Sequence, residues 1–217
     1  MNKITLDIFT DYVWPWCYLS TVSIDKLKEN YPVQTRWIHF PLHPETPAEG
    51  QSLAELFAGR DISEVKKRLQ DLMAEAGLPY GNRTHTFNSR LAQELGKWAD
   101  TQEGADKIHD LLYRAYFVDN VNIGDVDELV KIAGAAGLDE DTARQVIVER
   151  QFEAQVDEDW RRSRAIGVTG VPTFYANEMV VVGCQPYDVL EKFVKHLLSE
   201  RLTAERKAAE KNTTEQP

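Results

Sequence analysis

Cysteine is scarce in this sequence, since only Cys17 and Cys184 occur among its 217 residues. Two cysteines are too few for the disulfide framework that small secreted proteins use to reinforce a small core. The first ten residues, MNKITLDIFT, lack both the long apolar run and the small-residue cleavage site of a secretory signal. We therefore expect a cytoplasmic protein in a reducing compartment.

Long apolar runs and an excess of basic residues are also missing. No stretch approaches the ~20 apolar residues that a membrane-spanning helix needs, and the formal net charge is −10. Nucleic acids and anionic membranes bind basic surfaces, so we expect neither as a partner. What remains is an ordinary globular composition, 42% hydrophobic and 28% charged, in a chain long enough to bury a core.

Hydrophobic periodicity predicts the order of the first elements. Residues 3–10 alternate with a period of two, which predicts a strand. A helix is expected over residues 15–30, with Pro15 in its first turn, and a second strand over residues 33–40. This β-α-β opening favours a parallel pair of strands with a right-handed crossover.

The middle and the end of the chain differ in character. Residues 52–167 contain helical patterns and no convincing strand. Strand character returns at residues 171–177 and 179–183, and the intervening Asn177-Glu178 predicts a tight hairpin turn. A last amphipathic helix follows, and its expected apolar face consists of Val189, Leu190, Phe193, Val194 and Leu197. The order predicts an α/β protein with one sheet and a large all-helical insertion.

The stretch DYVWPWCYLS (11–20) lies where the first strand ends and the first helix begins. In a Cys-x-x-Cys site at such a junction, the helix N-terminus lowers the pKa of the first thiol. That thiolate attacks a disulfide, and the second cysteine resolves the mixed disulfide. Here the first position is Trp14, which has no thiol, and the second is Cys17. Trp14 and Trp16 are either a flat aromatic platform for a ligand or, in the case of Trp14, a plug.

Four segments together resemble one known family. They are DYVWPWCYLS, similar to a strand-end D-x-x-C-P-W-C-Y motif; FNSRLAQEL (87–95), similar to an asparagine-led helix start; residues 111–139; and residues 167–193, which resemble a cis-proline loop, a hairpin and a final helix. The family is that of the DsbA thioredoxin-fold oxidoreductases, and the likeness is closer to its cytoplasmic FrnE-like branch. It covers roughly residues 3–198.

The resemblance implies a thioredoxin fold with a large all-helical insertion between its β-α-β and β-β-α halves. We assign residues 1–43 and 166–202 to the thioredoxin-like domain and residues 44–165 to the inserted helical domain. Residues 203–217 are charged and polar, with almost nothing to bury. We assign them to a disordered tail, with a frayed extension of the last helix as the alternative.

The resemblance also implies a thiol-disulfide oxidoreductase-like protein whose W-P-W-C site lacks the first cysteine. Cys17 is then either a redox thiol or an inert, buried relic. Related 2-hydroxychromene-2-carboxylate isomerases and kappa-class glutathione transferases place a serine at the Trp14 position and bind glutathione. The alternatives are therefore a glutathione-dependent isomerase or transferase, with glutathione as cofactor, and a non-catalytic, chaperone-like binder. The expected partner is a small thiol, a disulfide or a peptide, and the oligomeric state is not predicted.

Further site residues follow from the same resemblance. In this fold the proline of Val171-Pro172 is cis, and the backbone before it lies beside the active thiol, where a substrate strand pairs. Cys184 is either a displaced thiol that approaches Cys17 or a semi-buried residue in an alanine slot. Asn88 matches a family asparagine that faces the groove, or it caps a helix. The implied catalytic residues are Cys17 and Cys184, and the implied substrate-binding residues are Trp14, Pro15, Trp16, Asn88, Val171, Pro172 and Gly183.

His39 and His43 are the remaining candidates. They are four residues apart, but Pro41 and Pro44 prevent one helix from presenting both imidazoles to a metal ion. We therefore interpret them as strand or loop histidines and predict no metal site.

Overall fold

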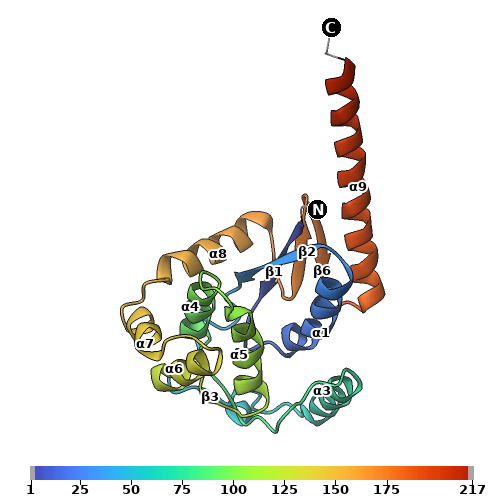
Figure 1. The fold of residues 1–217 in the computed structure, drawn as a ribbon. Coiled ribbons are helices and arrows are strands. Elements are labelled where there is room, and N and C mark those ends of the chain that lie inside the picture. The colour runs from blue at the N-terminus through green and yellow to red at the C-terminus, as the bar shows by residue number, and fades with distance from the viewer. Residues whose placement is uncertain (1–2, 215–217) are drawn as a thin grey trace.

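A four-stranded sheet forms the centre of the molecule (Figure 1). The computed structural model describes the backbone of residues 3–214 and the side chains of this range except 105 and 208–214. The strand order is β2-β1-β5-β6, with β1 and β2 parallel and β5 antiparallel to both β1 and β6. The strands are β1 (Ile4–Thr10), β2 (Val33–His39), β5 (Thr173–Ala176) and β6 (Met179–Val182). The predicted β-α-β and β-β-α halves are both confirmed.

Helices cover both faces of this sheet (Figure 1). On one face, α1 (Pro15–Asn30) packs beside α9 (Tyr187–Thr214), and both contribute to the buried cluster that contains Leu6 and Ile8 of β1. On the other face, α8 (Glu153–Ile166) packs against β2. Asp7, which alternates with Leu6 and Ile8, points to this second face and pairs with Arg162 of α8. The sheet is therefore covered on both faces, by α1 and α9 on one and by α8 on the other.

The insertion between β2 and β5 is mostly helical. Its helices are α2 (Leu53–Leu56), α3 (Ser63–Glu75), α4 (Arg90–Ala99), η1 (Ala105–Lys107), α5 (Ile108–Phe117), α6 (Val126–Ala135) and α7 (Glu140–Val148), after which α8 leads back to the sheet. The expectation that the insertion contains no strand is wrong in one detail, because β3 (Gln51–Ser52) pairs antiparallel with β4 (His85–Thr86). These two-residue strands have no periodicity to detect.

The insertion shares one core with the end of β1 and the start of α1. Tyr12 and Cys17 belong to the same buried cluster as Leu95, Tyr113 and Phe117 from α4 and α5. The ring of Tyr18 stacks on Phe117 with centroids 5.3 Å apart. The inserted helices therefore pack directly on the motif segment, residues 11–20. The domain boundaries at 43/44 and 165/166 stay a prediction.

The hairpin and the C-terminal helix give opposite outcomes for two predictions. The β5–β6 turn is confirmed, since Ala176 pairs with Met179 and both turn residues have positive φ, 48° at Asn177 and 62° at Glu178. The prediction of a disordered tail over 203–217 is wrong as far as Thr214, because α9 runs to that residue. Residues 215–217 lie outside the described residues. Alanine, glutamate, lysine and arginine dominate this stretch and are strong helix formers. No helix within residues 3–214 is long and apolar enough to cross a membrane.

Candidate functional site

The motif segment begins where β1 ends. The Trp14 N–H donates to the Asp11 carbonyl (3.2 Å), and a carboxylate oxygen of Asp11 accepts from the Val13 N–H (3.3 Å). Trp14 has an extended backbone (φ −102°, ψ 115°) and is the N-cap of α1, whose first residue is Pro15. Its carbonyl accepts from Cys17 N–H at 3.0 Å, while no side chain caps the helix. The indole thus stands at the N-cap of α1, the position at which the resemblance to the family places an attacking thiol.

Cys17 lies inside the protein, with 1% of its surface exposed. Burial raises the pKa of its thiol from 9.0 to about 12, although the Thr10 side chain and the Asp11 backbone form hydrogen bonds that oppose the shift. At neutral pH this thiol is almost entirely protonated, so it lacks the thiolate that disulfide exchange requires.

Cys184 lies in the turn after β6 and is partly buried. Burial raises the pKa of its thiol, and a hydrogen bond with the Ser20 side chain opposes the shift. Both cysteines are free, and after burial, the main cause, an electrostatic interaction with Cys184 also raises the pKa of Cys17. The two thiols therefore share one neighbourhood without a disulfide.

The loop before β5 lies beside the two cysteines. The Val171–Pro172 peptide bond is cis, and the Gly183 N–H donates to the Pro172 carbonyl at 2.8 Å. Val171 and Cys17 belong to one buried cluster. The proline loop and the Gly183 turn are thereby held together next to the first turn of α1.

Asp11 is a buried polar residue that the sequence analysis did not single out. It has no exposed surface, and its carboxylate accepts from the Leu42 N–H (3.1 Å) as well as from Val13. Burial raises the pKa of Asp11 to about 6, against hydrogen bonds from Ser89, Gln93 and the two backbone N–H groups. The sequence offered one signal for it, its position at the end of the first strand in the family motif.

A second polar group lies beneath the motif in the shared core. The Tyr12 hydroxyl is 2.6 Å from Nδ1 of His109, whose Nε2 is 2.8 Å from a carboxylate oxygen of Asp100. His39 is fully buried beside Tyr12, and neither of its ring nitrogens has a hydrogen-bond partner among the described residues. Burial lowers the pKa of His39 well below its ordinary value, so this imidazole is neutral at physiological pH. His43, by contrast, lies in a solvent-facing loop.

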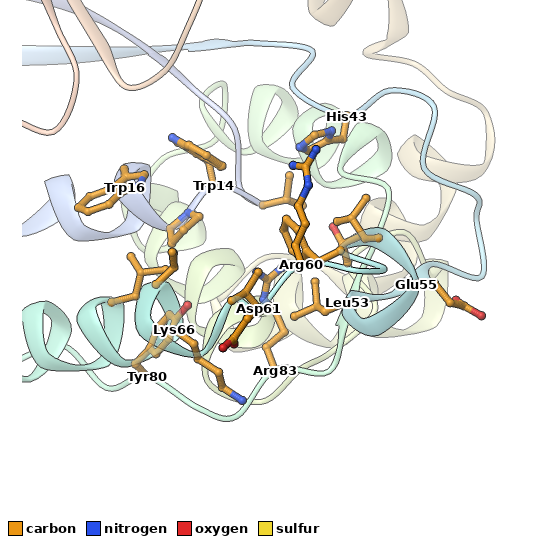
Figure 2. Close-up of a pocket in the computed structure, with 18 of the residues that line it drawn as sticks. Trp14, Trp16, His43, Leu53, Glu55, Arg60, Asp61, Lys66, Tyr80 and Arg83 are labelled. Carbon is orange, nitrogen blue, oxygen red and sulfur yellow. The ribbon is translucent and has the colours of Figure 1, made fainter.

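A cavity of about 740 Å³ opens beside the motif (Figure 2), and we call it the Trp14 cavity. One wall is the start of α1, with Trp14, Pro15 and Trp16. The other walls come from the segment between β2 and β5 and consist of His43, Leu53, Glu55, Leu56, Phe57, Ala58, Arg60, Asp61, Ile62, Val65, Lys66, Leu69, Tyr80, Gly81, Arg83 and Thr86. Val13 completes the lining. The cavity is a pocket of the size that small organic ligands occupy.

The sequence-predicted site residues therefore fall into separate places. Trp14, Pro15 and Trp16 line the Trp14 cavity, whereas the other predicted residues do not; these are Cys17, Asn88, Val171, Pro172, Gly183 and Cys184. The insertion wall was missed because residues 53–69 have only the helical periodicity of an ordinary solvated segment.

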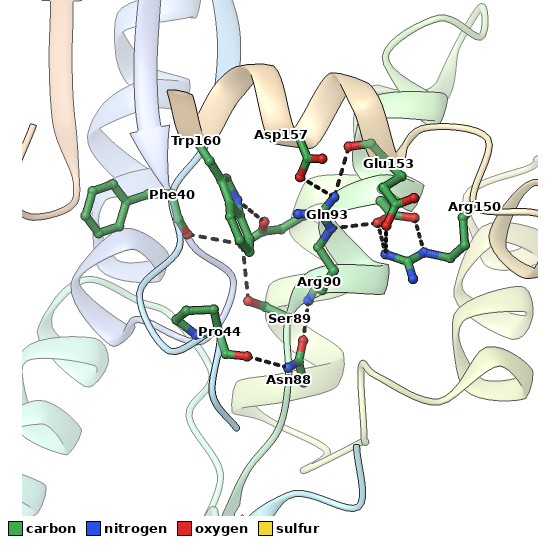
Figure 3. A network of polar contacts seen from close by, with 11 residues as sticks. Phe40, Pro44, Asn88, Ser89, Arg90, Gln93, Arg150, Glu153, Asp157 and Trp160 are labelled. Atoms are coloured by element: carbon green, nitrogen blue, oxygen red, sulfur yellow. Dashed lines mark hydrogen bonds and ion pairs between the residues drawn. The ribbon is translucent and has the colours of Figure 1, made fainter. Parts of the chain in front are cut away.

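Asn88 has a role in the architecture of the loop before α2 (Figure 3). Its side-chain amide donates to the carbonyls of Pro44 (3.3 Å) and Thr46 (2.8 Å), and its oxygen accepts from the Arg90 N–H (2.9 Å). The neighbouring Gln93 is held by Trp160, whose indole N–H donates to it at 2.9 Å. These contacts fix the loop from Phe40 to Thr46 against α4, behind the motif.

Comparison with known proteins agrees with this geometry. The chain is similar to the Bacillus subtilis protein YwbO, at 23% identity over 88% of this chain and 96% of the relative. Among solved structures, it is similar to a probable DsbA oxidoreductase from Streptomyces coelicolor, with a TM-score of 0.84, 26% identity and 91% of each chain covered.

Two further structures share the fold at 18% identity. One is a 2-hydroxychromene-2-carboxylate isomerase, with a TM-score of 0.71 and coverage of 93% of this chain and 99% of that one. The other is the cytosolic disulfide reductase DsbM from Pseudomonas aeruginosa with GSH, with a TM-score of 0.66 and coverage of 90% and 100%. The sequence profile of the DSBA-like thioredoxin domain matches residues 5–195. The chain therefore belongs to the family of DSBA-like thioredoxin domains.

Proposed function

We propose that this chain is a DsbA-family protein that binds a small thiol, a disulfide or a peptide beside Trp14 without performing two-cysteine disulfide exchange. One observation carries the proposal: Trp14 stands where the attacking thiol would be and also forms a wall of a large cavity. The site has kept the place where substrate meets the helix N-terminus and has replaced the nucleophile with an aromatic surface.

The two cysteines support the loss of exchange chemistry. Cys17 has the position of the resolving thiol, yet a resolving thiol acts only after a first thiol has formed a mixed disulfide. Its burial and its pKa of about 12 leave it without a role as a substitute nucleophile. Cys184 also has a raised pKa and has no cationic group among the causes of its shift. Neither thiol is activated in the way that reactive cysteines are.

The aromatic wall supports a binding role. Trp14 and Trp16 are both partly exposed, and both line the Trp14 cavity from the first turn of α1 (Figure 2). Indole rings offer a large apolar face with little conformational entropy to lose on binding. This favours the platform interpretation of Trp14 over the plug.

A glutathione-dependent isomerase or transferase is the second candidate. The observation that favours it is the cis Val171–Pro172 bond, whose proline carbonyl is hydrogen-bonded to Gly183 beside Cys184 and Ser20. The DsbM structure was solved with GSH, and a 2-hydroxychromene-2-carboxylate isomerase shares the fold. Isothermal titration calorimetry with reduced glutathione tests this second candidate, which requires glutathione binding and is overturned when no heat is released.

The setting that we propose is cytoplasmic, within the FrnE-like branch. It is supported by the pair of free cysteines and by the printed description of DsbM as a cytosolic disulfide reductase. The net charge of −10 supports a small-molecule or peptide partner over nucleic acid or an anionic membrane.

Alkylation of the native protein followed by peptide mass mapping tests the proposal. We expect Cys17 to resist iodoacetamide at pH 7.5 until the protein is unfolded, and the protein to be inactive in reducing insulin. Rapid native alkylation of Cys17, a Cys17–Cys184 disulfide or catalytic insulin reduction would each overturn it. Unfolding in guanidinium provides the control, because both cysteines must then react.

A further inference from the structure

The Trp14 cavity has an unusual balance of charge. Arg60, Lys66 and Arg83 all line it, and none of them forms an ion pair with a carboxylate among the described residues. The chain carries 35 acidic and 25 basic residues, so a basic group without an acidic partner is not the expected arrangement.

The two carboxylates of the cavity wall are already bound to the protein. Glu55 accepts from the hydroxyl of Ser52 at 2.8 Å and from its N–H at 3.3 Å, as the return contact of a capping box at the start of α2. Asp61 accepts from the Ser63 N–H at 2.9 Å before α3, and hydrogen bonds from the side chain and the backbone of Ser63 lower the pKa of Asp61. These carboxylates stabilise helix starts and form no ion pair with the cations of the wall, of which Lys66 donates instead to the side-chain oxygen of Asn82.

Arg83 supplies a second, independent observation. Its Nε is buried and has no hydrogen-bond partner in the described part of the chain. Another of its nitrogens donates to the Tyr116 hydroxyl, and its guanidinium lies over the Tyr116 ring, 4.8 Å from the centroid. An unpaired buried donor is costly, so the Arg83 guanidinium is held by its contacts with Tyr116 and by no carboxylate of the described residues.

Most of the remaining wall is apolar. Leu56 and Val65 remain 38% and 58% exposed at the edge of the cavity, facing the same space as Trp16 and Tyr80. In Figure 2 the two labelled tryptophans lie on one side, and Arg60 and Arg83 lie toward the other. An apolar surface with a cationic end is complementary to a molecule that is apolar at one end and anionic at the other.

We propose that the Trp14 cavity binds an amphipathic organic anion. Its aromatic or aliphatic body lies against Trp14, Trp16 and the apolar residues of α2 and α3, and its anionic group binds Arg83 and Arg60. The inference rests on the proposed function, because both require a ligand beside Trp14. It adds the charge and the polarity of that ligand.

Two fluorescent probes with the same aromatic skeleton test the proposal. 1-Anilinonaphthalene-8-sulfonate carries a sulfonate, and N-phenyl-1-naphthylamine lacks it. Arg83→Gln and Arg60→Gln should each weaken sulfonate-probe binding by about fivefold to tenfold, the scale of one charge-assisted hydrogen bond. Binding of the neutral probe should change less than twofold. Arg60→Gln is the safer variant, since its side chain has no hydrogen-bond partner among the described residues.

A third cavity variant, Val65→Glu, locates the probes, and Lys67→Gln and Val148→Glu are the matched controls for the arginine variants and for Val65→Glu. Lys67→Gln removes a charge from α3 outside the cavity lining, so both dissociation constants should stay within twofold. Val65→Glu places a carboxylate in the cavity at an exposed position and should weaken both probes, the sulfonate more strongly. Val148→Glu, at a 62% exposed position of α7, should affect neither.

The outcomes separate the inference from the function on which it rests. Loss of sulfonate-probe affinity in the arginine variants with unchanged neutral-probe affinity supports both. If both probes bind and the arginine variants have no effect, the inference that the ligand is an anion is overturned, while the proposed ligand site beside Trp14 stands. If neither probe binds, or if Val65→Glu leaves their binding unchanged, the Trp14 cavity is not a ligand site. That result overturns both the inference and the proposed function.

Discussion

Cys17 lies one helical turn beyond Trp14, and its backbone N–H donates to the Trp14 carbonyl at 3.0 Å. This bond closes the first turn of α1 and directs the two side chains into different surroundings. Trp14 lines an open cavity, whereas the Cys17 thiol lies in the core between the sheet and the insertion. Under the proposed function, the chain retains the framework of a two-cysteine site with the exposed thiol exchanged for an indole.

Trp14→Cys should restore the missing nucleophile. A thiol at the N-cap of α1 meets unpaired N–H groups and the helix dipole, which lower its pKa into the range of reactive cysteines. We expect native alkylation at pH 7 to become at least about 100-fold faster than for the wild type, with the label on residue 14. Trp14→Ser is the control and should gain no reactivity. If Trp14→Cys reacts no faster, the motif has been placed wrongly on the fold.

Asp11→Asn should change how stability depends on pH. The pKa of Asp11 is 3.8 in the unfolded reference and about 6 in the folded protein, so between these values the folded state binds more protons. The free energy of unfolding should therefore fall as pH rises from about 4 to about 6, by up to about 3 kcal/mol from this group. Urea unfolding at pH 4.5 and 6.5 measures the difference, which Asp11→Asn should reduce. An identical difference in the variant would contradict the assignment.

Glu94→Gln should destabilise the insertion. The Glu94 carboxylate is buried and accepts from Arg90 at 2.7 Å and from two nitrogens of Arg150 at 2.6 and 2.7 Å. Removing its charge leaves Arg90 with only the exposed Asp157 and Arg150 with only the exposed Glu153 as ion-pair partners, at a cost of about 2–3 kcal/mol in the free energy of unfolding. Glu128→Gln, which breaks an exposed pair with Lys131, should cost less than about 0.5 kcal/mol. Equal effects of the two variants would show that burial does not strengthen the Glu94 pair.

Gly96→Ala tests how closely α4 packs on the motif segment. A methyl group there would overlap the Tyr12 hydroxyl and lie 3.3 Å from Nε2 of His39. Tyr12 is fully buried and bonded to His109, so it cannot move aside, and we expect a loss of about 2 kcal/mol.

Gly134→Ala is the matched control in α6. There the added methyl meets the carboxylate end of Glu140, which is exposed and free to rotate. Alanine should be neutral or stabilise this helix by up to about 1 kcal/mol. Urea unfolding of both variants measures the contrast, and a Gly96→Ala variant as stable as the wild type would contradict the packing described above.

Local sequence patterns determined most of the architecture. Alternation over 3–10, the β-branched and aromatic residues of 33–40, Pro15 at the start of a helix and Asn177-Glu178 between two strands each correspond to an element that forms where it was predicted. The absence of a cysteine three positions before Cys17 was likewise visible, because it depends only on which residue occupies position 14. These features depend on residues that are adjacent in the chain, so they can be recognised from the sequence alone.

The tertiary structure alone decided the character of the site. The pKa of Asp11 depends on α4, the burial of Cys17 depends on the insertion core, and the Trp14 cavity exists because residues 53–69 lie opposite α1. Arg60 and Arg83 have no periodic or spacing signal that connects them with Trp14. Their importance comes from long-range contact and desolvation, which arise only when segments distant in the sequence enclose a common space.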